Sequence, residues 1–212
     1  MGWQERQGHG ARFLALTAVL LILAAPAWAA SVAPARAVVA HFQNSLLTVM
    51  KAGQRLGFKG RYEHLMPAVE RTHDLSFIAQ LTLGPYWGKL SPSSRAAFVH
   101  AFRDLTVATY AAEFRRYSGQ TFKRTAAQVV AQGDVLVETE LAAHGRKEAT
   151  IDYLLARAGG RWEIVNIVAN GVSDLALKRA QYTAVIRKEG FPALLKLVQA
   201  KVNALSKGQV KG

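Results

Sequence analysis

The sequence predicts an α+β fold in which an antiparallel four-stranded sheet, a meander, packs against several helices with an apolar cavity between the layers. Apolar residues recur at three- and four-residue steps up to about residue 117, which is typical of helices. The period then switches to two between residues 122 and 168, and helical spacing returns after Ser173. Short glycine-containing turns separate the alternating segments, which favours hairpins over crossover connections.

The first 29 residues have the composition of a secretory signal peptide. Arg6 and Arg12 precede an apolar run, and Ala27-Trp28-Ala29 gives a small-x-small cleavage pattern. The apolar run is shorter than the roughly 20 residues that a membrane-spanning helix needs. We therefore expect cleavage after Ala29, export, and a single domain over residues 30–212; an uncleaved anchor is the alternative.

Four helices are predicted before the sheet, and the last of them has the widest apolar face. They cover residues 33–52, residues 61–71, a segment capped by Asp74 that ends at Leu83, and a segment that runs from Ser91 to about Tyr117. The last helix carries two adjacent apolar stripes, Phe98, Phe102, Leu105, Thr109 and Ala112 beside Val99, Thr106, Tyr110, Phe114 and Tyr117. A face of this width exceeds what one neighbouring element covers.

The predicted strands and the two C-terminal helices are delimited by turn and cap residues. The strands cover residues 122–130, 135–143, 148–156 and 161–168. Ser173 is a suitable N-cap for a helix that runs to about Lys188, and Gly190 ends it. Phe191-Pro192 begins the last helix.

Charge and cysteine content restrict the partners and the chemistry. The formal net charge is +13, and the chain has no cysteine. Thiol catalysis, disulfides and zinc-thiolate sites are therefore excluded. An exported basic protein meets no nucleic acid in service, so its electrostatic partners would be acidic protein surfaces or anionic lipid head groups, with transient membrane-surface contact. The alternative is that scattered basic residues only maintain solubility.

No catalytic or metal-binding pattern is present, so we expect no enzyme activity, no cofactor and no metal. No two of the histidines stand at the spacing of metal ligands, so we expect each to lie at the surface or at the edge of the core. They are His41, His64, His73, His100 and His144. No Gly-x-Ser-x-Gly elbow occurs. Carboxylates on the predicted strands are usual for a solvent-exposed sheet face. The alternative is an enzyme that acts on an apolar substrate, and it predicts that Glu138, Asp152 or Glu163 points into a cavity.

Aromatic and aliphatic residues from all layers could line an apolar cavity for a lipid, although an ordinary filled core is the simpler interpretation. The residues we expect to bind lipid are Trp87, Phe98, Phe102, Leu105, Tyr110, Tyr153, Ile164, Val168 and Tyr182. Successive side chains of a strand point to opposite faces of the sheet, so the strand register decides which of them face the helices. A register shifted by one residue would place Val165, instead of Ile164, on the helix-facing side.

Several segments, in this order and spacing, resemble one family across nearly the whole chain after residue 29. They are Phe98-x-x-x-Phe102-x-x-Leu105-x-x-x-Thr109-Tyr110-Ala111, Tyr117-Ser118-Gly119-Gln120-Thr121-Phe122, Ile151-Asp152-Tyr153, Trp162-x-x-x-Asn166-Ile167-Val168 and Gly171-Val172-Ser173. These resemble the periplasmic lipid-binding proteins called MlaC or toluene-tolerance proteins. Asn166 in place of a usual aspartate, and Leu177-Lys178-Arg179 in place of Asn-Tyr-Arg, look closer to the hopanoid-associated HpnM branch.

The resemblance implies a mixed helix-and-sheet fold with a deep apolar cavity. It also implies a soluble carrier that passes lipid, hopanoid or phospholipid, between an inner-membrane ABC transporter and an outer-membrane complex. The alternative to a carrier is a periplasmic adaptor that binds membrane proteins without carrying lipid. An adaptor of this kind predicts a closed core.

Overall fold

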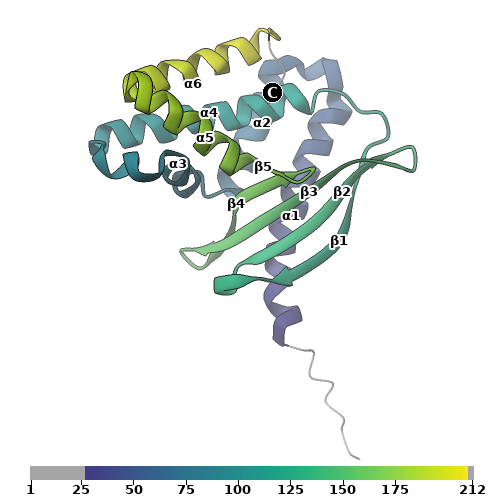
Figure 1. Ribbon diagram of the computed structural model, residues 1–212. Coiled ribbons are helices and arrows are strands. Elements are labelled where there is room, and N and C mark those ends of the chain that lie inside the picture. Colours follow the sequence, from purple (N-terminus) through teal and green to yellow (C-terminus); the bar gives the residue numbers. More distant parts are fainter. Residues whose placement is uncertain (1–26, 210–212) are drawn as a thin grey trace, which may run out of the picture.

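Helix α1 (Ala27–Ala52) crosses one face of the sheet, and the other helices gather at one end of it (Figure 1). The computed structural model describes residues 27–209, with side chains from residue 32. Most of the expected signal peptide lies outside these residues, and cleavage after Ala29 stays a prediction. Across the described range, no helix is both long and apolar enough to cross a bilayer.

Helices α2 (Gly57–Thr72), α3 (Leu75–Leu83) and α4 (Pro92–Glu113) follow, with short 3-10 turns η1 (Gly53–Leu56) and η2 (Gly84–Lys89) between them. Two predicted caps start these helices. The Asp74 carboxylate accepts a hydrogen bond from the Phe77 backbone N–H at 2.9 Å, and the Ser91 hydroxyl accepts one from the Ser94 N–H at 3.1 Å.

Helix α4 ends four residues earlier than the predicted Tyr117. Its last residue is Glu113, and Phe114 leaves the helical region with φ −90° and ψ 53°. The buried side chain of Arg61 donates from Nε to the carbonyl of Ala111 at 2.7 Å. A tertiary donor thus satisfies a carbonyl of the last turn, which local sequence does not reveal.

The sheet has five antiparallel strands in sequence order, not the predicted four. Strands β1 (Thr121–Val129), β2 (Val135–Ala143), β3 (Arg146–Ala158) and β4 (Arg161–Ala169) match the expected meander, and β5 (Val172–Ser173) adds an edge. Asn170 and Gly171 have φ of 50° and 80°, the two positive values of a tight hairpin turn. Periodicity could not indicate β5 because two residues are too few.

A β-bulge in β4 changes which of its side chains face the helices. Leu155 pairs with Ile164 and Leu154 pairs with Asn166, so β4 has one extra residue at this point. Beyond the bulge, Ile167 lies opposite the buried Tyr153, and Val168 lies opposite Asp152. Ile167, rather than the predicted Val168, therefore shares the helix-facing side with Ile164.

Two antiparallel helices, α5 (Asp174–Glu189) and α6 (Phe191–Ser206), complete the chain at the same end of the sheet (Figure 1). Gly190 joins them with φ 82°, a conformation that glycine adopts without strain. Tyr182 is the one buried residue of α5, whereas α6 buries Leu194, Val198 and Leu205. Helix α5 packs chiefly on α3, α6 and β4, whereas α6 packs on α4 and α5.

Candidate functional site

Aromatic rings fill the interface between the sheet and α1. The Phe42 ring centroid lies 4.7 Å from that of His73, 5.0 Å from that of Tyr110 and 6.4 Å from that of Tyr153. The buried Gln43 amide donates to the Thr139 hydroxyl at 3.2 Å and to the Tyr153 hydroxyl at 3.4 Å. Hydrogen bonds thus satisfy the buried amide of Gln43 within this aromatic layer.

A small hollow, here called the sheet-side cleft, separates β4 from α3, α4 and the first turn of α5. Its volume is about 20 Å³. Its lining residues are His73, Leu75, Ile78, Phe102, Thr106, Tyr110, Ile164, Asn166, Ile167, Asp174 and Leu175. This space is enough for about one water molecule.

The floor of the sheet-side cleft is polar as well as apolar. The His73 ring is buried, with Nδ1 2.9 Å from the Thr72 hydroxyl and Nε2 3.5 Å from the Tyr110 hydroxyl. Burial lowers the pKa of His73 to about 4 and raises the pKa of Tyr110 well above its ordinary value. Both groups are neutral at pH 7, and His73 belongs to the core rather than to its edge.

A larger hollow, here called the helical seam, lies between α4, α5 and α6. Its volume is about 380 Å³, within the range of about 300–1,000 Å³ typical of ligand sites. Its lining residues are Leu105, Thr109, Glu113, Asp174, Leu177, Lys178, Gln181, Tyr182, Leu197, Val198 and Lys201. The seam therefore combines an apolar floor with a charged rim.

The charged rim of the seam is electrostatically coupled. Burial raises the pKa of Glu113, Asp174 raises it further, and the cations Lys178 and Lys201 oppose the shift. Asp174 and Lys178 form an ion pair one helical turn apart on α5. Since Asp174 lines both the seam and the sheet-side cleft, the two hollows meet at the first turn of α5.

Asn166 and Ser173 hold this first turn of α5 against β4. The Ser173 hydroxyl donates to the Asn166 side-chain oxygen at 3.1 Å and accepts from the Ala176 N–H at 3.2 Å. The Leu175 N–H also donates to Asn166, at 3.4 Å. The predicted cap of Ser173 is confirmed, and Asn166 extends it into a connection between strand and helix.

The structure distributes the predicted lining residues over several places. Phe102, Tyr110 and Ile164 meet at the sheet-side cleft, and Leu105 and Tyr182 meet at the helical seam. The alternative Val165 is also buried, but it occupies the bulge.

The other predicted residues lie outside both hollows. Phe98 and Tyr153 are core residues, and the Phe98 ring packs edge-on against Tyr182 at 5.9 Å. Trp87 lies in η2, where the Arg95 guanidinium sits 5.4 Å from the ring centroid.

Several polar residues that line the two hollows are not indicated by the sequence pattern. His73 and Asp174 border the sheet-side cleft, and Lys178 and Lys201 border the seam. Spacing gave no signal for them because they come from different elements. Asn166 did carry a signal, since it departs from the residue that the resembled family has at this position.

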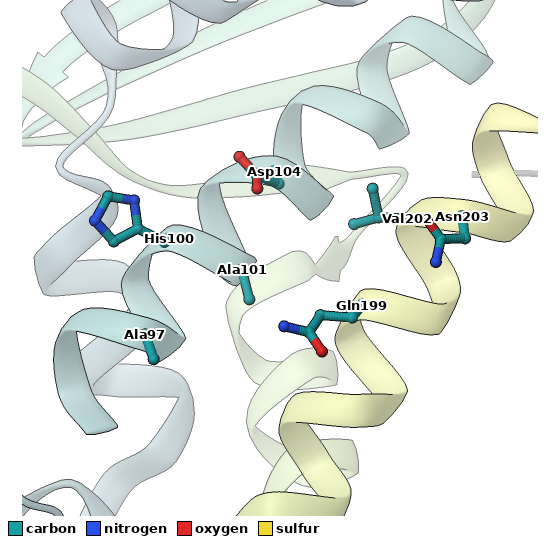
Figure 2. Close-up of a pocket in the computed structure, with 7 residues that line it drawn as sticks. All are labelled: Ala97, His100, Ala101, Asp104, Gln199, Val202 and Asn203. Atoms are coloured by element: carbon teal, nitrogen blue, oxygen red, sulfur yellow. The ribbon is translucent and has the colours of Figure 1, made fainter. Parts of the chain in front are cut away.

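A third hollow, between α4 and α6, is lined by both polar and small apolar side chains (Figure 2). Its volume is about 550 Å³, and its lining residues are Ala97, His100, Ala101, Asp104, Gln199, Val202 and Asn203. Arg103 and the Tyr62 hydroxyl both donate to Asp104, and burial together with Asp104 raises the pKa of Tyr62 to about 12. The Asp104 carboxylate is thus engaged in structural hydrogen bonds.

The carboxylates that would serve an enzyme lie elsewhere. Glu138, Asp152 and Glu163 line none of the three hollows, and Glu163 accepts a hydrogen bond from Arg161 at 2.7 Å. Among residues 27–209, no three His, Cys, Asp or Glu side chains are grouped so as to hold a metal ion.

Comparison with known proteins gives a family and a fold. A family model described as MlaC protein matches residues 41–200. A solved structure of a phospholipid-binding protein from Ralstonia solanacearum, in complex with a phospholipid, superposes with a TM-score of 0.73 at 20% sequence identity. The match covers 82% of this chain and 99% of the Ralstonia chain, so the two share the same fold throughout.

Proposed function

The chain belongs to the MlaC family, and we propose that it is a periplasmic lipid-binding carrier. It would shuttle hopanoid or phospholipid between the inner and outer membranes as the soluble component of an ABC-type lipid transport system. The phospholipid bound by the Ralstonia protein of the same fold supports a lipid ligand. The basic surface, with a formal net charge of +13, supports brief contacts with anionic membranes or acidic partners.

The observation that carries this proposal is that two hollows on the apolar face of α4 meet at the first turn of α5. Thr106 and Tyr110 of one stripe of α4 line the sheet-side cleft together with Phe102 of the other stripe. Leu105 and Thr109, from the same stripe as Phe102, line the seam. The first turn of α5 lies between the two hollows. Burying a lipid tail here would gain about 0.8 kcal/mol per methylene.

Loading requires α5 to move, because the sheet-side cleft is too small for a hydrocarbon tail. Leu177 of α5 keeps 49% of its surface accessible, whereas Tyr182 is buried and Leu175, Val185 and Ile186 pack partly buried against the core. The first turn of α5 is held chiefly by hydrogen bonds to Asn166. Replacing these bonds with hydrogen bonds to water costs only a modest free energy. Displacing this turn would join the seam and the cleft into one apolar groove along α4.

The nature of the cargo decides how far α5 must move. Two flexible acyl chains can follow a curved groove, whereas a rigid polycyclic hopanoid needs a straight space of full width. Once the seam is open, its charged rim would hold a polar head near water while the tail lies along α4. The carrier would release its cargo only when a partner shifts α5, since burial alone retains a long tail.

Lipid extraction followed by mass spectrometry tests the proposal directly. We would purify the protein under native conditions with Thr106→Trp and Thr48→Trp variants. Both threonines donate to the carbonyl four residues earlier, at 2.9 Å and 2.8 Å, but Thr106 lines the cleft and Thr48 is exposed on α1. We expect the indole at position 106 to reduce co-purified lipid about tenfold, equivalent to about 1.4 kcal/mol, and the indole at position 48 to leave it unchanged.

The adaptor alternative gives the opposite result. The filled interior next to Phe42 is what a protein without cargo would also have. If folded wild-type protein yields no lipid, or if both tryptophan variants keep the wild-type load, the carrier assignment is wrong.

A further inference from the structure

A basic groove lies where the end of α4 meets α2 and the C-terminal end of α6. Its volume is about 750 Å³. Arg61, Arg115 and Lys207 supply three cationic side chains, and Phe58 and Leu205 supply apolar walls. These residues come from separate parts of the chain, so no local sequence pattern indicated the groove.

Arg61 is a buried cation that the fold leaves incompletely paired. Only 7% of its surface is exposed. Its Nε donates to the Ala111 carbonyl at 2.7 Å, and among residues 27–209 its two terminal nitrogens form no ion pair or hydrogen bond but remain accessible to solvent. The capping bond engages one of five N–H groups. Because these N–H groups reach solvent beside the groove that Arg61 lines, they are available to a ligand there.

The charges around Arg61 increase the positive potential instead of compensating it. Burial lowers the pKa of Arg61, and the nearby Arg115 lowers it further. Glu113 borders the groove, but its electrostatic partners are Lys178, Asp174 and Lys201 on the seam side. A bound anion would relieve the repulsion between the two guanidinium groups.

We propose that this groove binds a phosphate-type anion, and that the anion is the head group of a lipid held in the helical seam. Glu113 lines both hollows, so a tail in the seam would bring its head group to the groove. The planar fork of Arg61 suits bidentate contact with phosphate oxygens. Phe58 and Leu205 suit the first carbons beyond the phosphate. The choice of head group over free phosphate rests on the proposed carrier function.

The test compares two lipids that differ only in the phosphate head group. Binding of phosphatidylglycerol and of diacylglycerol with the same acyl chains would be measured on wild type, Arg61→Lys, Arg115→Gln and Arg116→Gln. Arg116 is an exposed neighbour that does not line the groove, so its variant is a matched charge control. Inorganic phosphate forms a third arm and identifies a free-phosphate site.

We expect Arg61→Lys and Arg115→Gln each to weaken phosphatidylglycerol binding about tenfold while diacylglycerol binding stays constant and Arg116→Gln changes neither. Arg115 is exposed, so its variant remains informative if Arg61→Lys fails to fold. Equal phosphatidylglycerol binding by Arg115→Gln and wild type, with no phosphate binding, would overturn the anion site. Phosphate binding that depends on Arg115, with neither lipid bound, would keep the anion site and refute the carrier function instead.

Discussion

The two sides of α4 are packed in different ways. Toward the sheet, Phe42, Tyr153 and Ile164 are each at most 1% exposed, and their neighbours form a continuous set of ring contacts. Toward α5 and α6, Leu177 and Leu197 each remain 49% exposed above an open seam. One helix therefore borders both a filled core and an unfilled hollow.

This difference separates the part that maintains the fold from the part that can change. Ring packing and the buried hydrogen bonds of Gln43 fix the position of α1 on the sheet. Helix α5 fully buries Tyr182 and packs on α3, α6 and β4, and its first turn, held by hydrogen bonds to Asn166, is the part that can open locally. We infer that a cargo enters where stability is lowest.

The largest effect should come from removing a ring on the filled side. Phe42→Ala should lower the free energy of unfolding by about 3–5 kcal/mol, because it leaves a cavity between His73, Tyr110 and Tyr153. Leu177→Ala on the open side should change it by less than about 0.5 kcal/mol. Urea unfolding of both variants measures the contrast, and equal losses would show that the two sides are not packed differently.

The next effect is a pH dependence that arises at His73. Its pKa in the folded state is about 4, below the ordinary 6.5, so the unfolded chain binds the proton more tightly. Stability is therefore fully present above pH 6.5 and is lost as the pH falls toward 4, by about 3 kcal/mol for this group.

A His73→Gln variant isolates that contribution from those of the carboxylates. We expect its unfolding free energy to fall less steeply than that of wild type between pH 6.5 and pH 4, as measured by urea titrations at each pH. Parallel curves would mean that the imidazole does not titrate in this way.

A smaller effect should appear at the anchor of α5. Asn166→Ala removes the acceptor for Ser173 and Leu175, so we expect a loss of about 1 kcal/mol. Amide hydrogen exchange should accelerate in α5 and stay unchanged in β2 and β3. A uniform change across all elements would contradict independent motion of α5.

The smallest effect on stability, with a distinct effect on binding, is expected at the seam. The double variant Leu177→Ser and Leu197→Ser should change the unfolding free energy by less than about 1 kcal/mol, since both side chains are half exposed. Its lipid load, measured by mass spectrometry, should nevertheless fall. An unchanged load would remove the seam from the proposed binding path.

Local signals predicted most of the elements and their caps. Asp74, Ser91 and Ser173 act as N-caps as expected, and β2 has the predicted bounds, Val135–Ala143. These features depend on hydrogen bonds and alternation within a few residues, so the sequence alone carries them. The apolar face of α4 is confirmed at Phe98, Phe102 and Leu105, which are buried, but the predicted Phe114 and Tyr117 lie beyond the helix.

Features that depend on distant contacts were not predicted. Because of the bulge in β4, Ile167 rather than Val168 faces the helices. Helix α4 ends at Glu113, where Arg61 donates to the carbonyl of Ala111, and His73 is buried because it packs against Phe42 of α1. Each results from a residue meeting a partner far along the chain, which periodicity cannot register.

The sequence by itself determined the order of helices and strands, the absence of cysteine chemistry and the excess of apolar surface on α4. Only the tertiary structure decided that this surface is divided between a filled interface and an open seam, and that Arg61, Arg115 and Lys207 come together. The physical reason is that helices and strands form through short-range hydrogen bonds and spacing, whereas hollows and charge clusters depend on how those elements pack in space.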